Sequence, residues 1–466
     1  MASIRIRRQA VTSSGVLRRV GDLDLARVCD PRVRGRIEFS MDAQLKLLVV
    51  GALSGASSMR EVELRSEQLR DSVRGWMGLK DRVADNTLGL LLQRLAPSEL
   101  RAAMVRQVKA EHRRGGGFGA QSLKWSTFAI DGKHVSTLQW HALVSATRRV
   151  LKEIDGHPVH DDPGWLPTKQ EVRLVFSTRF PHVQLAQPKD KSAPLYGLVR
   201  VHRTTLVSHD AAPCVDENPI HGETNELGSI VKTIQQLVAN YRHTNMMELV
   251  TMDAGNTCLN AADLLVARGV QYFMAIKSPQ GDIHDEALRV LAHPKRTPDF
   301  SSGETRSGRA VAYETFVEPL PEGYLKWAHA RALVRVHRVT TGTDVGDKPT
   351  EGNRYYVTSI PPEELTAELA QSISRHHWRC ENEGHWTSDA IFKEDARQAP
   401  WSRHPTGVLA VSAIRMIAEN VLAMFRALSK IRTSVGRLLK PPWNVVRKHF
   451  LAVLFDARLE SAAFDA

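Results

Sequence analysis

Three short apolar runs, each ending at a charged residue, most constrain what this chain can fold into. They are 126–130, which precedes Asp131; 248–252, which precedes Asp253; and 270–276, which precedes Lys277. Helical patterns over 225–242 and 261–268 separate the later runs. Strands that alternate with helices predict an α/β sheet, and functional side chains in such sheets gather at the carboxyl ends of strands. We therefore expect an α/β fold in which these charged residues lie at one edge.

The regions on either side of this alternation have different patterns. Residues 38–113 are helical in pattern and end at the glycine-rich segment 113–119, which predicts a linker. Short helices with tight polar turns are typical of a helix-turn-helix unit that contacts DNA and equally of a helical domain that only packs. Residues 305–360 are β-rich, and the pattern becomes helical again from Pro362.

The charge balance favours a polyanionic partner. Lys and Arg total 63 against 51 Asp and Glu, which gives a net charge of +12, and residues 1–20 form a basic arm. No run of about 18 apolar residues is evident, so we expect no membrane partner. The four cysteines (Cys29, Cys214, Cys258 and Cys380) are far apart and form no CxxC pair, which argues against a disulfide framework. A cytoplasmic location is expected.

Three carboxylates carry the strongest chemical signal. Asp131 and Asp253 follow strands, and Glu381 lies in a helical segment. Such a set can converge on one point, and hard oxygen ligands suit Mg²⁺ or Mn²⁺. Two such ions stabilise the attacking and leaving oxygens of an in-line phosphoryl displacement. A single aspartate at a strand end is more often a cap or turn residue, so the signal lies in the set of three.

The segment around Glu381 allows further interpretations. His377, Glu381, His385 and Asp389 are four residues apart, which predicts one polar helix face that is either part of an active site or simply solvated. His376, Cys380 and His385 are also close enough in sequence for a zinc site, although no second ligand cluster supports one.

Several stretches resemble the DDE-type bacterial insertion-sequence transposases, specifically the H-repeat-associated branch. The stretches are Phe128–Lys133, Thr224–Leu227, Val250–Thr257, Lys277–Gln280 and Tyr355–Ala396. Together they span most of 126–426, and 38–105 more loosely resembles the amino-terminal domain of that family. The resemblance implies a ribonuclease-H-like catalytic core with a β-rich insertion, preceded by an all-helical N-terminal domain. It places the catalytic and metal-binding triad on Asp131, Asp253 and Glu381, with Asp131 bridging two ions.

The resemblance also implies partners and an activity. A DNA transposase would cut at element ends and transfer the strands into target DNA. Its partners would be the double-stranded terminal inverted repeats, the target DNA and, once DNA is bound, a second copy of the chain in a homodimer near the nucleoid. The expected DNA contacts come from a set of basic, aromatic and polar residues: Lys133, Lys277, Arg375, Trp378, Arg379, Asn382, His385 and Trp386.

The sequence departs from the family in two places. Relatives outside this branch have Tyr, Arg and Lys around the glutamate, whereas this chain has Ser374, His377 and Ser388. Pro279 stands where the branch often has Asn. Phosphate contacts must therefore come from other residues.

These observations predict five segments: a helical N-terminal domain with its basic arm (1–115), the first part of the catalytic core (120–289), the β-rich insertion (290–361), the catalytic and closing helices (362–435) and a basic C-terminal tail (436–466). The rival interpretation is a retired transposase that binds DNA or represses without cutting. A retired copy tends to lose one carboxylate, and all three are present here.

Overall fold

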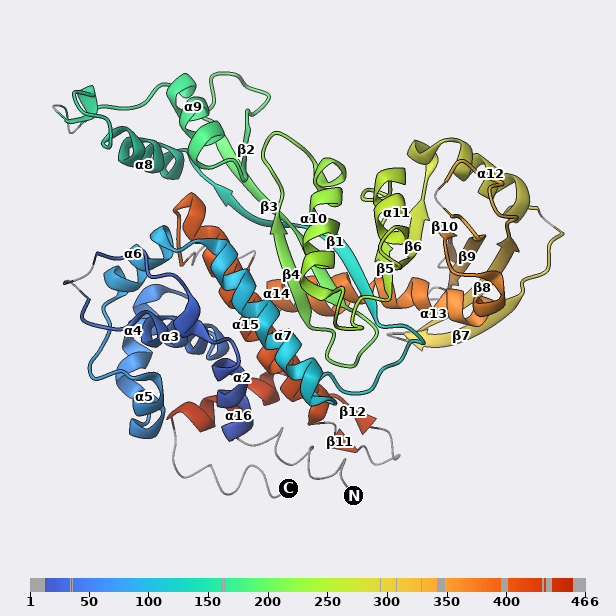
Figure 1. Ribbon diagram of the computed structural model, residues 1–466, viewed down its shortest axis with the longest axis horizontal. Coiled ribbons are helices and arrows are strands. Elements are labelled where there is room, and N and C mark those ends of the chain that lie inside the picture. Colours follow the sequence, from blue (N-terminus) through green and yellow to red (C-terminus); the bar gives the residue numbers. More distant parts are fainter. Residues whose placement is uncertain are drawn as a thin grey trace.

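A mixed α/β architecture with one large sheet and many helices emerges from the computed structural model (Figure 1). The structure describes residues 13–455 except 34, 36, 161, 163, 294, 307, 328, 342–347, 395–400, 430 and 433–437. Most of the predicted basic arm and the end of the predicted tail lie outside these residues.

The centre of the sheet is built from strands on either side of β1. The bounds are β1 Thr127–Leu138, β2 Val183–Ala186, β3 Tyr196–Leu206, β4 Cys214–Pro219, β5 Leu249–Met252 and β6 Gln271–Ile276. Strand β3 pairs antiparallel with β1, β2 and β4. Strands β1, β5 and β6 run parallel, with Ile130 of β1 opposite Met252 of β5. In this part of the sheet, β4, β3 and β1 are therefore successively antiparallel, and β5 and β6 follow parallel to β1.

The β-rich segment continues the same sheet. Its strands are β7 Phe300–Arg306, β8 Arg309–Pro319, β9 Ala332–Thr340 and β10 Thr350–Thr358. Strand β10 pairs antiparallel with β6, and the order outward is then β9, β8 and β7. The insertion is thus fixed to the core by backbone hydrogen bonds along β6.

Helices cover both faces of the sheet. One face packs against α10 Glu226–Tyr241, α11 Leu259–Val266 and α12 Asp282–Leu291, and shares their apolar core through Phe128 and Ile130. The other face carries α13 Ala367–His377, a π-helix η5 Cys380–His385 and α14 Trp386–Ala390. Because side chains alternate along a strand, Ala129 and Asp131 face the opposite way from Phe128 and Ile130, towards the π-helix.

The N-terminal helices form a second apolar core with the C-terminal helices. They are α2 Ser13–Gly21, α3 Met41–Leu53, α4 Met59–Gln68, α5 Asp71–Met77, α6 Asp85–Arg94 and α7 Pro97–Arg114. They pack around α15 Pro405–Leu428 and α16 Trp443–Phe455 (Figure 1). The predicted tail therefore contains a helix whose Val446 and Phe450 are buried.

Helix α15 corrects one expectation from the sequence. By length and composition it is apolar enough to cross a membrane, which the sequence analysis did not find. Its most apolar window is 94% buried within the protein, between the N-terminal helices and the sheet. That burial is typical of a core helix, because an apolar helix needs an apolar surface on every side.

Two further differences concern the first strand and the segment after it. Strand β1 does not end at Asp131 but continues to Leu138, because β3 pairs with it along this whole length. Its pairing with β5 stops at Ile130. The segment 150–195, for which no element was predicted, contains η2 Pro158–His160, α9 Lys169–Arg179 and β2, and follows α8 Trp140–Leu151. These helices bury their own apolar cluster with Val408 and Leu409 of α15.

The remaining short elements are η1 Leu25–Arg27, η3 Ser278–Gln280, η4 Pro362–Glu364, β11 Ile431–Arg432 and β12 Leu438–Leu439.

Candidate active site

Asp131 and Asp253 lie on neighbouring strands at the same level of the sheet. Ile130 pairs with Met252, so the residue after each is an aspartate, and both aspartates lie on the face opposite the α10 core. Strand β5 ends at Met252, and the Asp253 side chain accepts hydrogen bonds from the backbone and side-chain nitrogens of Asn256 at 3.1 and 2.8 Å. Both aspartates were predicted at strand ends. The structure places Asp131 within β1 and Asp253 directly after the end of β5.

Glu381 comes to this face from the π-helix η5, which follows α13. A π-helix inserts an extra residue into a helix, and such insertions are frequent at functional sites. His377 is buried and contacts Thr251 Oγ1 at 2.9 Å, whereas Asp389 pairs with Lys133. With His385 beside Asp131, these contacts place His377, His385 and Asp389 against the face of the sheet that carries Asp131, as the spacing predicted.

The three carboxylates lie within electrostatic reach of one another. Burial is the largest cause that raises the pKa of Asp131, and together with the charges of Asp253 and Glu381 it brings this pKa to about 7. Burial also raises the pKa of Glu381, with Asp253 adding to the effect and Arg354 opposing it. Like charges held this close favour the protonated form of each carboxylate.

Glu226, at the start of α10, is a fourth carboxylate at this site that the sequence analysis did not assign. A Cβ at Gly132 would lie 2.3 Å from the Glu226 carboxyl carbon, so this carboxyl group lies against the backbone next to Asp131. Burial raises the pKa of Glu226, and the charge of Asp253 adds to this. The signal was present in the segment Thr224–Leu227, which resembles the family but carried no chemical argument of its own.

Neutral histidines surround the carboxylates. His385 Nδ1 lies 3.5 Å from Asp131 Oδ2, and His202 contacts Asn256 Oδ1 at 3.2 Å, which in turn holds Asp253. Burial lowers the pKa of His385 to about 3, and of His202 and His377 to about 4. At neutral pH these imidazoles are uncharged, so His385 lies beside Asp131 without neutralising it.

The residues considered for zinc contact different partners. His376 lies 2.8 Å from Ser122 Oγ, while Cys380 and His385 face Asp131. Burial raises the pKa of the Cys380 thiol well above its usual value. A protonated thiol is a poor zinc ligand.

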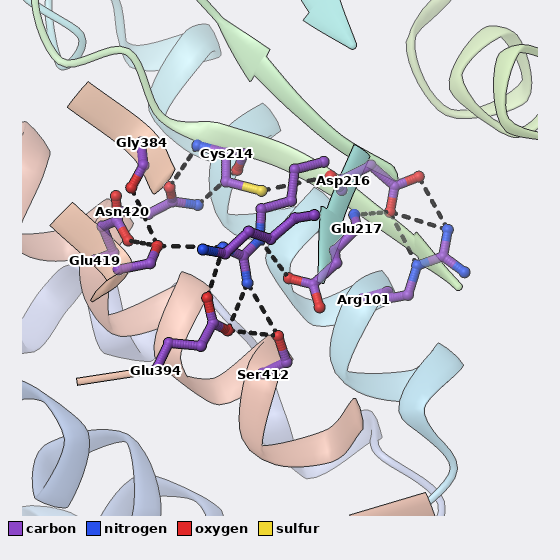
Figure 2. A network of polar contacts seen from close by, with 12 residues as sticks. Arg101, Cys214, Asp216, Glu217, Gly384, Glu394, Ser412, Glu419 and Asn420 are labelled. Atoms are coloured by element: carbon purple, nitrogen blue, oxygen red, sulfur yellow. Dashed lines mark hydrogen bonds and ion pairs between the residues drawn. The ribbon is translucent and has the colours of Figure 1, made fainter. Parts of the chain in front are cut away.

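A buried ion network holds the segment after the π-helix against the sheet (Figure 2). Arg203 of β3 donates to both oxygens of Glu394 at 2.8 and 2.6 Å, and more weakly to Glu217 at 3.2 Å. It also contacts Ser388 of α14, whose hydroxyl donates to the Gly384 carbonyl and to Glu419 of α15. The network thus connects β3, α14 and α15 next to Asp131, which pairs in register with Arg203.

The predicted DNA-contacting residues fall into two groups. Lys133 is nearly buried in an ion pair with Asp389, with Nζ–O distances of 2.6 and 2.5 Å, and Lys277 is exposed at the end of β6. The others lie along the α13–π-helix–α14 segment. Arg375 pairs with Glu304, and Arg379 pairs with Glu383.

The aromatic and polar members of the second group differ in exposure. Trp378 lies beneath the Arg354 guanidinium, with 3.8 Å between that group and the ring centroid, whereas Trp386 is 54% exposed. Asn382 is exposed beside Glu381. His385 instead faces Asp131.

The donor set suits a hard divalent cation. Asp131, Asp253, Glu381 and Glu226 offer only oxygen atoms, and a cation would reverse the repulsion that raises the pKa of Asp131. Within the described part of the chain, however, no three His, Cys, Asp or Glu side chains already form a metal-binding group. Ion binding would therefore have to draw the carboxylates closer together.

Comparisons with known proteins add little. No family model and no curated protein matches this sequence. Among solved structures, the chain is similar to piggyBac transposase in a synaptic complex with hairpin DNA, studied by cryo-EM. The identity is 9% and the TM-score 0.40, covering 99% of this chain and 81% of that chain. A TM-score of 0.40 does not establish a shared fold, so the site's own geometry has to carry the functional argument.

Proposed function

We propose that this chain is a DDE-type DNA transposase with a ribonuclease-H-like core. The observation that carries the proposal is the convergence of Asp131, Asp253 and Glu381, from three separate chain segments, on one face of the sheet. Strands in the order β4-β3-β1-β5-β6, three antiparallel and then two parallel, are what such a core requires. The resemblance of the flanking sequences points to the same class.

The proposed reaction is phosphoryl transfer on DNA. When bound, two Mg²⁺ or Mn²⁺ ions supply the positive charge that stabilises the attacking and leaving oxygens. Asp131, Asp253 and Glu381 hold that charge at the reacting phosphate, and His385 and Asn256 orient the two aspartates. Water displaces the 3′ oxygen at the element end, which leaves as a free 3′-OH. That hydroxyl then attacks a phosphodiester of target DNA and releases its 3′ oxygen.

Partners follow from this reaction and from the charge of the chain. Element-end and target duplexes would bind through phosphates, so the affinity should fall steeply with salt. Joining two ends requires two copies of the site, for which a DNA-bound homodimer is the simplest assembly. Such an enzyme would work beside the bacterial nucleoid in the cytoplasm.

Cleavage of labelled element-end DNA tests the proposal. We expect cutting by the purified protein in Mg²⁺ or Mn²⁺, none in EDTA, and loss of more than about 100-fold in Glu381→Gln, since even residues behind a metal ligand typically contribute 10–100-fold. DNA binding by the variant should persist.

Glu363→Gln is the matched control, because Glu363 is exposed on η4 before the catalytic segment. It should cut like the wild type. If the wild type binds DNA but never cuts it with any metal, the chain is the retired DNA-binding protein and the enzyme proposal fails.

A further inference from the structure

One face of the insertion sheet changes from apolar to arginine-rich along its strands. Register places Thr315, Val336 and Arg354 side by side, and one step further out Tyr313, Arg338 and Gly352. The next step outward pairs Val311 with Thr340. At the end of the face, Arg309 of β8 pairs with Arg306 of β7. Since side chains alternate, these residues lie on the same face as Val334 and Tyr356, which pack on α13.

Beyond the residues that pack on α13, this face of the sheet lines a pocket. The outer half of the sheet and the α13–π-helix segment enclose a basin of about 1170 Å³. Its sheet wall carries the exposed arginines Arg306, Arg309, Arg338 and Arg354, and Glu381 lies in its other wall. The basin is therefore continuous with the proposed catalytic site.

The charges in the basin are unevenly balanced. Glu304 is neutralised by Arg375 at 2.6 Å, and Glu383 by Arg379 and Lys440, each at 2.9 Å. Among the residues that the structure describes, none of the four sheet arginines forms an ion pair with a carboxylate. Glu351 and Glu368 also line the basin, so six lining arginines face five glutamates, and the arginines outside ion pairs are those of the sheet wall.

We propose that this basin binds an unpaired DNA strand that continues from the phosphate held at the carboxylates. The inference rests on the proposed function and adds the form of DNA and the surface that holds it. Arg306, Arg309 and Arg338 contact successive phosphates. Arginine suits this role because its planar group of donors binds phosphate oxygens in pairs.

The geometry favours a single strand over a duplex. The sheet forms one wall of the basin and the α13–π-helix segment forms the other. A surface that binds duplex DNA is instead open along the double helix. Arg354 lies flat over Trp378 and offers its other face towards the basin. A base can stack on a guanidinium plane only after it leaves its partner, and such stacking is typical of single-strand binding.

The test compares the binding of three DNAs by the full chain in EDTA, where no cutting occurs. Fluorescein-labelled blunt duplex, the same duplex with a single-stranded extension, and the extension strand alone are titrated by anisotropy over a range of salt. We expect the extension to strengthen binding. The double variant Arg309→Gln/Arg338→Gln should bind the extended DNA about tenfold or more weakly, and its salt slope should fall by about 0.7 for each lost phosphate contact.

The matched control is Arg173→Gln/Arg268→Gln, which removes two exposed arginines on α9 and just after α11. It has the same change of charge and should keep the preference for the extension. The inference is overturned if both double variants behave alike, or if the basin variant loses blunt-duplex binding as strongly as extended binding. Cleavage of element ends by the wild type is measured separately, so the proposed function can stand when the basin inference fails.

Discussion

Asp131 illustrates how a single side chain can carry an unbalanced charge in a folded protein. Its side chain is only 14% exposed and lies next to His385, which burial keeps neutral, and within reach of Asp253 and Glu381. Burial and the neighbouring negative charges both favour the protonated form. The site is therefore destabilised at neutral pH until a cation binds.

The pH dependence of stability follows from this pKa. Asp131 has an ordinary pKa of 3.8 and a folded value of about 7, so the folded state binds the proton more tightly. Below 3.8 both states are protonated and the group has no effect. As the pH rises towards 7 the free energy of unfolding falls, and above 7 the loss is constant. At about 1.36 kcal/mol per pKa unit, the loss is at most about 4 kcal/mol.

Urea denaturation in EDTA at pH 5 and pH 8 measures this loss. We expect Asp131→Asn to be more stable than the wild type at pH 8, and added Mg²⁺ to stabilise only the wild type. Equal pH dependence in both proteins would show that Asp131 is not the titrating group.

Sequence reasoning located this aspartate but not its surroundings. A buried run followed by Asp131 and Gly132 predicted a carboxylate near a strand end, and the parallel pairing with β5 places Asp253 beside it. Glu226 was not predicted, because its proximity depends on how α10 packs over Gly132, about 90 residues earlier in the chain. Local sequence contains no information about such a contact.

At the scale of elements, the π-helix and the buried ion network determine where Glu381 points. Arg203 of β3 is fully buried, and its partner Glu394 has a pKa lowered to about 2 by that charge. Burial raises the pKa of Glu217, and raises that of Glu419 to about 8, so both favour the neutral form. The network therefore contains one strong ion pair that positions α14 and, through Ser388, the end of the π-helix.

Arg203→Met tests the contribution of this pair. Removing one partner of a buried ion pair leaves an uncompensated charge on Glu394, so we expect a loss of about 3–5 kcal/mol in the free energy of unfolding. Urea denaturation measures it, and the Glu394→Leu change added to Arg203→Met should recover part of the loss.

The exposed pair Arg179–Glu153 provides the control. Its side chains are 58% and 62% exposed, so Arg179→Met should change the free energy of unfolding by about 0–1 kcal/mol. Similar losses in the two arginine variants would contradict the role assigned to Arg203.

Most elements were predictable from their patterns, and those that were not depend on partners distant in sequence. Strands β5 and β6 and helix α10 match the predicted runs within a few residues. The π-helix was missed because residues 377–389 satisfy ordinary helical spacing. Strand β4 was missed because its buried residues Asp216, Glu217 and Asn218 are polar, and their ion pairs with Arg203 and Arg101 come from distant parts of the chain.

At the scale of the whole molecule, α15 joins parts that are far apart in the chain. It packs against α3, α6 and α7 on one side and against the sheet on the other. Buried residues such as Leu48 and Leu91 thus share a core with Ile414 and Ile417. The glycine-rich segment 113–119 predicted a domain boundary, but α15 contributes to the apolar cores on both sides of it.

A fragment of residues 1–115 should therefore not fold independently. Without α15 its helices would expose the apolar surface that they now bury, and we expect little cooperative melting by circular dichroism and self-association by size-exclusion chromatography. Addition of a separately made 401–455 segment should restore helical structure. A monomeric, cooperatively melting fragment would show that the N-terminal helices are an independent domain.

The position of Glu381 so late in the chain has a consequence during synthesis. The two aspartates precede it by at least 128 residues, including the whole insertion. At about 5–20 residues per second, a ribosome completes Asp253 roughly 6–25 s before it reaches Glu381. A nascent or prematurely terminated chain that ends before Glu381 therefore has both aspartates but lacks the complete set of carboxylates that the proposed reaction requires.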